Sequence, residues 1–356
     1  MTGEEHNTRK KSMEIGIYTL GDLCPNPVTG ETISAKQRLE EIIAAAKLAD
    51  EAGLDVFGVG EHHRLDYAVS APSVVLAGIS QVTRWITLTS ATTVLNTVDP
   101  VRLIEAYSVL DLISNGRAEI MAGRGAFHEA FHLFGYDMTH YDELFEEHLE
   151  LLLKILSEEK VTWKGTFRSE LNEAVISPRP LQKKFPVWVG VGGSADSAAR
   201  AGRYGVNMAV AMLGGHPNTF RPLFDAYRQT AKKAGHDLNQ LKVGVTGHAY
   251  LAKTTEQAKE EYYPYHSNYW NIVNAQQGSA LRLTRDAFNR LAEPETALFV
   301  GSPDLIVEKI LKQHELFGHQ RFLAQLDIGG MPFKKVAECI ELLATEVAPA
   351  VRKATR

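Results

Sequence analysis

The stretch GLDVFGVGEHH, residues 53–63, combines the signals that decide the fold. Gly53 follows a segment in which Leu39 and Ile42 begin a helical spacing of apolar residues, and a glycine at that point favours the end of a helix. The apolar run at 55–60 predicts a buried strand, and polar residues follow it at once. The stretch therefore predicts a helix, a buried strand and a polar strand end in succession.

The same alternation of apolar strand and amphipathic helix recurs along the chain of 356 residues. The apolar runs are nearly continuous, as in a parallel sheet that is covered on both faces. Eight such runs favour a closed barrel over an open sheet. We therefore predict an α/β protein with a single (β/α)8 TIM barrel and insertions, spanning 13–356. The predicted strands are 14–20, 55–60, 86–93, 118–123, 186–192, 207–212, 242–252 and 321–328.

Three segments depart from the short connections of such a barrel. The polar leader 1–12 is predicted to be flexible and solvated, with Met13 as an alternative start of the chain. Residues 159–185 are predicted to add extended structure. Residues 262–300 begin with the aromatic- and amide-rich YYPYHSNYWNIVNAQQ. An insertion of this length is usually a lid or binding loop, and the other interpretation is a plain surface excursion.

Composition and charge exclude several classes of partner. A formal net charge of −5 argues against nucleic acid, which would require a basic stripe. No stretch approaches the roughly 18 apolar residues of a membrane helix, and the leader lacks the apolar core of a secretory signal. Cys24 and Cys339 fit neither a disulfide framework nor a thiolate metal site. We expect a cytoplasmic protein with no membrane or nucleic-acid partner.

Glu61, His62 and His63 follow the second predicted strand, at the end of the barrel where reacting groups lie. A metal site is one interpretation, but neighbours in an extended chain point to opposite sides, so we predict no metal. A second is a neutral imidazole that acts as an acid/base group, with Glu61 able to orient it. A third is a structural histidine satisfied by its own loop. The residues alone leave the last two open.

Two glycine-rich strand ends are candidates for a phosphate site. GVGGSADSAARAG, residues 190–202, runs into a helix near Ser194, and bare amides at a helix start bind anions. It fits the dinucleotide pattern G-x-G-x-x-A, but no acidic residue follows about 20 positions later for the ribose. A mononucleotide phosphate, or a turn without ligand, remains. Arg124, which lies between glycines, is suited to clamp a phosphate or to form a surface ion pair.

The third predicted strand ends in SATTVLNTVDP, residues 90–100. Small and hydroxyl-bearing residues such as Ala91 and Thr92 suit a flat ring that lies against the backbone, and Asn96 follows on the same rim. Asp99 before Pro100 predicts the N-cap and first turn of the next helix.

These motifs together carry a resemblance to a known family. The stretches GLDVFGVGEHH, DPVRLIEAYSVLDLISNGRAEIMAGRG, FHLFGYDM, PVWVGVGGSADSAARAG and GSPDLIVEKI make the chain similar to the bacterial luciferase-like flavin-dependent monooxygenases of the α-subunit type. The resemblance implies a TIM barrel that takes reduced FMN from a separate NAD(P)H:flavin reductase. It further implies reaction with O₂ through a C4a-hydroperoxide, which oxygenates a small organic substrate.

The resemblance also assigns residues. It makes His62 the catalytic histidine, with Glu61 beside it, and puts a non-proline cis peptide beneath the flavin at Ala91–Thr92. It implies a mobile lid within 262–300 and a homodimer formed through helices near the second and third strands. The expected cofactor contacts are Ala91, Thr92, Asn96, Arg124, Gly125, Gly192, Gly193 and Ser194.

Two departures bear on activity. Light-emitting α-subunits carry a reactive cysteine where this chain has Gly123, and a histidine where it has Asp99, so light emission is not expected. Two rival functions remain: a deazaflavin (F420)-dependent dehydrogenase on the same barrel, and a non-catalytic flavin-binding relative. The substrate is not fixed, although YYPYHSNYW and AMLGG indicate a partly apolar pocket.

Overall fold

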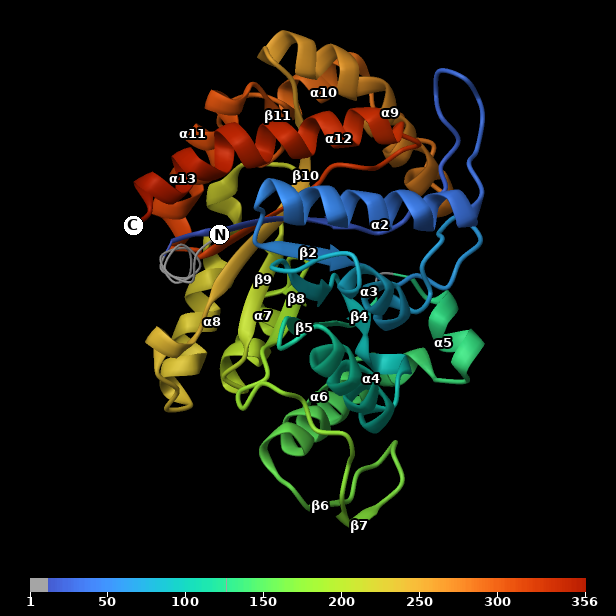
Figure 1. Cartoon of the computed structure of the whole chain (residues 1–356), viewed down its shortest axis with the longest axis vertical. Coiled ribbons are helices and arrows are strands. Elements are labelled where there is room, and N and C mark those ends of the chain that lie inside the picture. Colours follow the sequence, from blue (N-terminus) through green and yellow to red (C-terminus); the bar gives the residue numbers. More distant parts are fainter. Residues whose placement is uncertain (1–11, 126) are drawn as a thin grey trace.

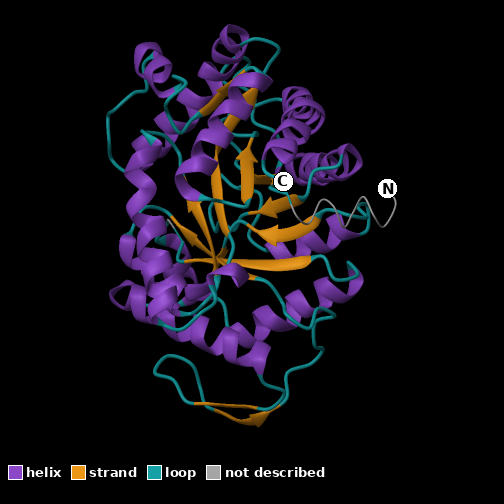
Figure 2. Cartoon of the chain, turned by 90° about the vertical axis from the view of Figure 1, so that its left-hand side faces the viewer, coloured by secondary structure: helices purple, strands orange, loops and turns teal. Residues whose placement is uncertain are grey.

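Eight parallel strands close into a barrel in chain order, with the last strand paired to the first. The structure, a computed structural model, describes residues 12–125 and 127–356. Figure 2 shows the strands surrounded by helices, so the predicted TIM barrel is confirmed. The barrel strands are β1 (Glu14–Thr19), β2 (Val56–Val59), β3 (Thr87–Ser90), β5 (Ala118–Gly123), β8 (Val187–Val191), β9 (Asn207–Ala211), β10 (Val243–Leu251) and β12 (Arg321–Gln325).

Helices cover the outside of the barrel, and the capping signals set where several of them begin and end. Ser34 accepts a hydrogen bond from the Gln37 amide at the start of α2, and Gly53 ends that helix at φ 85°. Asp99 caps α4 as predicted. The covering helices are α2 (Ala35–Ala52), α3 (Pro72–Ser80), α4 (Pro100–Ile113), α6 (Tyr141–Ser157), α7 (Ala195–Arg203), α8 (Arg221–Lys233), α11 (Pro303–Phe317), α12 (Phe333–Leu342) and α13 (Ala348–Ala354) (Figure 1).

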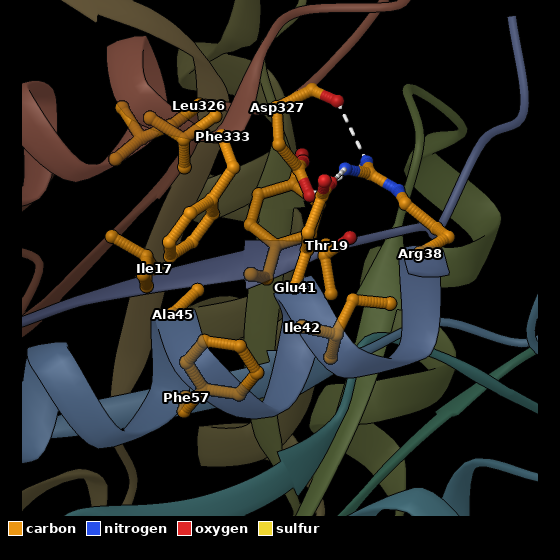
Figure 3. A pocket seen from close by; sticks show the side chains of 12 residues that line it. Ile17, Thr19, Arg38, Glu41, Ile42, Ala45, Phe57, Leu326, Asp327 and Phe333 are labelled. Carbon is orange, nitrogen blue, oxygen red and sulfur yellow. Dashed lines mark hydrogen bonds and ion pairs between the residues drawn. The ribbon is translucent and has the colours of Figure 1, made fainter. Parts of the chain in front are cut away.

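A buried ion pair fixes α2 against the barrel. The Arg38 guanidinium donates to the backbone oxygen and to a carboxylate oxygen of Asp327, both at 2.8 Å, just after β12 (Figure 3). Asp22, after β1, lies 3.7 Å from the same guanidinium. Because the Arg38 side chain is buried, these carboxylates compensate its charge and join the loops after the two strands.

The two long connections differ in kind. Within 159–185, β6 (Val161–Trp163) and β7 (Leu171–Ala174) form an antiparallel hairpin, which confirms the predicted extended structure. Within 262–300 the prediction of a loop is wrong: the aromatic stretch belongs to the helix α9 (Thr255–Gln276), followed by α10 (Arg285–Leu291) and β11 (Phe299–Gly301).

The misreading of α9 has a sequence cause. Pro264 lies inside the helix and disfavours it, whereas Tyr262, Tyr265 and Tyr269 are buried at the spacing i, i+3, i+7 that marks a helix face. The spacing of these three tyrosines is the feature of the sequence that indicates a helix here. The predicted leader, apart from Ser12, lies outside the described residues.

The barrel interior holds a cluster of charged side chains near the amino-terminal ends of the strands, in addition to apolar side chains. Arg321 on β12 donates to both carboxylate oxygens of Glu119 on β5, at 2.6 and 3.0 Å, and to Glu14 on β1 at 2.8 Å. Its guanidinium stacks over the Trp188 ring at 4.2 Å. Burial raises the pKa of Glu14, but the charges of Arg321 and Lys242 outweigh it and bring that pKa to about 2. Glu14 and Arg321 are therefore both charged at neutral pH.

Replacing Arg321→Met should lower the free energy of unfolding by about 3–5 kcal/mol, because the buried Glu119 carboxylate would lose its cation, whereas Glu14 keeps its contact with Lys242. Guanidinium denaturation at pH 7 measures the loss. The matched control is Lys36→Met, which removes an exposed ion pair with Glu40 and should change stability by less than about 0.5 kcal/mol. Equal effects of the two variants would contradict a structural role for the cluster.

Candidate active site

A cavity of about 360 Å³ opens at the carboxyl ends of the barrel strands, and every one of the eight strands or the loop after it contributes to its wall. This is the end of a TIM barrel where reacting groups lie. Predicted site residues that line the cavity are Glu61, His62, Ala91, Thr92, Arg124, Gly125 and Gly192. The remaining predicted residues, Asn96, Gly193 and Ser194, lie nearby but do not line it.

His62 is held by aromatic rings at one side of the cavity. Its ring stacks on Tyr67 with centroids 4.0 Å apart and meets the edge of Phe127 at 5.5 Å. Burial, the largest effect, lowers the pKa of His62 to about 4. Its Nδ1 has no hydrogen-bond partner among the described residues. At neutral pH His62 is thus an uncharged imidazole that can accept or donate a proton.

Glu61 does not contact His62, so the prediction that Glu61 orients that imidazole needs correction. One Glu61 oxygen lies 2.9 Å from His63 Nε2, and the other accepts from the Val94 amide at 3.1 Å. The side chains of Glu61 and His63 therefore pair with each other, whereas the imidazole of His62 lies at the cavity wall between aromatic rings. Among residues 12–125 and 127–356, no group of three or more His, Cys, Asp or Glu side chains is placed to hold a metal ion.

Thr92 fills the floor of the cavity between two glycines. The Ala91–Thr92 peptide bond is cis. A Cβ atom at Gly123 would overlap the Thr92 hydroxyl, and a Cβ at Gly190 would lie 2.7 Å from Thr92 Cγ2. The Thr92 side chain thus occupies the space that a side chain at 123 would need, which gives a physical reason why Gly123 stands in this chain.

The part of the cavity wall after β5 presents cationic groups. Arg124 donates to Ser197 Oγ at 2.7 Å and to an Asp142 carboxylate oxygen at 2.6 Å, and it stacks over the Tyr141 ring. Arg200 donates to the same Asp142 oxygen at 2.8 Å. Two guanidinium groups therefore converge on one carboxylate.

The start of α7 completes this cationic end. Ser194 caps the helix, and the stretch from Gly192 through Ser194 is exposed, with open space beside both glycines. Arg200 is 7% exposed, and its Nη1 has no hydrogen-bond partner in the described chain. Guanidinium groups, a hydroxyl and free helix amides form the donor set that a phosphate monoester takes.

Sequence reasoning missed Arg200, Ser197 and Asp142. The signal for the first two was their spacing: Ser194, Ser197 and Arg200 are three residues apart and so share one side of α7.

Asn96 has an indirect place in the site. It is fully buried, and its amide donates to the Tyr141 carbonyl at 2.6 Å. The Tyr141 hydroxyl in turn donates to the Gly125 carbonyl at 2.8 Å, while its ring lies beneath Arg124. Asn96 therefore positions Tyr141 and, through it, the loop that carries Arg124 and Gly125.

With this geometry in place, comparison with known proteins gives the family. The family model for luciferase-like monooxygenases matches residues 13–320. The chain belongs to the luciferase-like monooxygenase family. It is 24% identical over 336 residues to the oxygenase component of the flavin-dependent trigonelline monooxygenase of Acinetobacter baylyi, covering 88% of this chain and 90% of that protein.

Solved structures of luciferase-like proteins share the barrel. The monooxygenase RslO1 of Streptomyces bottropensis is 26% identical, with a TM-score of 0.81 over 95% of this chain and 99% of its own. The oxygenating constituent of 3,6-diketocamphane monooxygenase of Pseudomonas putida, in complex with FMN, is 22% identical with a TM-score of 0.76 over 95% and 98%. An F420-dependent secondary alcohol dehydrogenase has the same fold at 17% identity, with a TM-score of 0.74 over 96% and 99%.

Membership of this family makes the protein similar to flavin-dependent oxidoreductases. The family alone does not decide whether the cofactor is FMN or the deazaflavin F420. No helix in the described part of the chain is both long and apolar enough to cross a bilayer.

A cysteine at position 123 tests the packing at the cavity floor. Gly123→Cys should lower the free energy of unfolding by about 1–3 kcal/mol, because its Cβ overlaps the Thr92 hydroxyl. Chemical denaturation measures the change. The double variant Gly123→Cys with Thr92→Gly, which removes the whole Thr92 side chain, should recover most of the loss, and Thr92→Gly alone is the control. A Gly123→Cys protein as stable as the parent would show that Thr92 does not decide this position.

Proposed function

We propose that the protein is the oxygenase component of a two-component monooxygenase that uses reduced FMN and O₂. The observation that carries the proposal is one cavity with a phosphate-type donor set at Arg124 and α7, and a neutral imidazole, His62, at another part of its wall. A separate NAD(P)H:flavin reductase would supply the reduced flavin. When bound, reduced FMN supplies two electrons, so that one oxygen atom enters a small organic substrate and the other leaves as water.

Each part of the site then has a task. Arg124, Ser197 and the amides at the start of α7 hold the phosphate group. The backbone at Ala91–Thr92 and the glycines beside it give a flat ring close access to the cavity floor. His62, kept uncharged by burial, exchanges a proton with the reacting group.

Two other functions compete with this proposal. An F420-dependent dehydrogenase would use the same barrel, and a non-catalytic relative would bind flavin without turnover. Titration with FMN, reduced FMN and the deazaflavin separates the first, because tight binding of the deazaflavin alone would exclude FMN chemistry. Anaerobic mixing with reduced FMN, followed by O₂ and a panel of small organic substrates, separates the second by whether an oxygenated product forms.

Two variants test the separate roles of Arg124 in FMN binding and of His62 in product formation. Arg124→Ala should weaken FMN binding by about tenfold or more, because a charge-assisted contact to phosphate is lost. His62→Ala should leave FMN affinity nearly unchanged and slow product formation by about 10²–10⁴. Fluorescence titration and rapid-mixing absorbance measure the two effects.

A complementary variant is Asp142→Asn. It removes the carboxylate that competes for Arg124 and Arg200, so it should tighten FMN binding. Unchanged affinity in both Arg124→Ala and Asp142→Asn would refute the phosphate role, and unchanged turnover in His62→Ala would remove that residue from the mechanism.

We also propose a homodimer formed through α3 and α4. These neighbouring helices expose apolar side chains, which is unusual for a surface with no partner. Val74 on α3 is 69% exposed, and Val109, Leu112 and Ile113 on α4 are each between 44% and 47% exposed. Sedimentation velocity at micromolar concentration should give the mass of two chains, and Ile113→Asp should shift it toward one. A single-chain mass for the parent would contradict this interface.

The segment 262–300 is proposed to close the cavity during turnover. Tyr269 on α9 lines the cavity, and Asn268 donates to the carbonyl oxygens of Pro25 and Gly329 in the loops after β1 and β12. The following residues 280–282 are exposed. Limited proteolysis there should slow when reduced FMN is bound, and equal cleavage rates would oppose a closing motion.

A further inference from the structure

Three neighbouring strands present polar side chains at one level of the barrel interior. In the parallel register Tyr18 on β1 is paired with Gln325 on β12, and Gln325 is paired with His248 on β10. All three line the cavity, together with Thr246 from β10. We call Tyr18, Gln325 and His248 the polar row.

Gln325 is the centre of this row and has no partner for either end of its amide. Its side chain is 1% exposed, and neither Oε1 nor Nε2 forms a hydrogen bond within the described chain. His248 beside it is equally buried, and its Nδ1 is also unpartnered. Buried polar atoms of this kind cost stability unless a ligand or water pairs with them. Their place on a cavity wall makes them candidates for ligand contacts.

The polar row carries no charge at neutral pH. Burial lowers the pKa of His248 to about 4 and raises the pKa of the Tyr18 phenol. The charged residues that line the cavity, Glu61 and Arg124, already have side-chain partners elsewhere on its wall, His63 for Glu61 and Asp142 for Arg124. A ligand that meets the row therefore gains hydrogen bonds but no charge pairing, which selects a neutral group.

The row lies opposite the proposed flavin contacts. In the closed strand order β1, β2, β3, β5, β8, β9, β10, β12, the strand β12 is four positions from β5, so Gln325 faces the side of the barrel that carries Arg124. Small apolar side chains, Ala209 and Ala211, complete this half of the wall. A molecule on the row would thus face the flavin across the cavity, which is the position a substrate needs.

We propose that the polar row binds a neutral substrate through a planar amide edge, in which a carbonyl oxygen adjoins an N–H group, as in a lactam. The amide of Gln325 supplies one donor and one acceptor side by side, which matches this edge with two parallel hydrogen bonds. His248 and Tyr18 flank the pair. This inference deepens the proposed function and rests on it, because it assigns the substrate half of the same cavity.

The test compares δ-valerolactam with δ-valerolactone, two rings of equal size of which only the lactam has an N–H donor. Ligand-observed NMR on the full chain, with and without FMN, should show the lactam binding about tenfold or more tighter than the lactone. Gln325→Met, which keeps the length of the side chain, should remove that preference. The same variant should also unfold at a higher temperature, because it removes two unpartnered buried atoms.

Gln313 on α11 provides the matched control. It too is 1% exposed with both amide atoms unpartnered, and it does not line the cavity. Gln313→Met should leave the lactam preference unchanged.

Three outcomes would overturn the proposal: equal binding of lactam and lactone to the parent, a lactam preference that survives in Gln325→Met, or weaker FMN binding in Gln325→Met. The last would mean that the row contacts the flavin. Lactam binding is measured without turnover, so its failure is distinct from a failure of the reduced FMN experiment.

Discussion

The ion cluster of Arg321, Glu119 and Glu14 connects opposite strands inside the barrel, and the rest of the barrel packs around it. Arg321 spans the barrel from β12 to β5, the strand opposite it in the closed order, and its charge is compensated at both ends of that span. A guanidinium in a barrel interior is costly unless its donors are satisfied, and here carboxylates and the Trp188 face satisfy them. These side chains occupy the amino-terminal end of the barrel interior, and the cavity described above lies at the carboxyl ends of the strands.

Above this cluster, shape is controlled by residues that have no side chain. Gly123 and Gly190 leave room for Thr92, and Thr92 takes the volume that a side chain at position 123 would need. The side chain at position 92 and the residue at position 123 are therefore coupled, although they belong to different parts of the chain. The family fold is kept while the surface offered to a flat ring changes, which is how one barrel serves several chemistries.

The sequence predicts those features that depend on local pattern. The eight strands were visible because each is a near-continuous apolar run, and Gly53 and Asp99 marked helix ends through their own backbone and side-chain chemistry. What could not be predicted depends on closure of the barrel. Glu61 pairs with His63 because an irregular loop turns both side chains to one side, and Asp142 meets Arg124 and Arg200 only when α6, β5 and α7 are side by side.

Asp142 bridges Arg124 and Arg200. Two guanidinium groups that would repel each other are held together by one carboxylate oxygen of the same chain. The cationic pocket is thus preorganised, and little ordering remains to be done when an anionic group enters. Under the proposed function, binding would exchange one anion for another on a framework that is already in place, as a flavin phosphate that enters and leaves in every cycle would require.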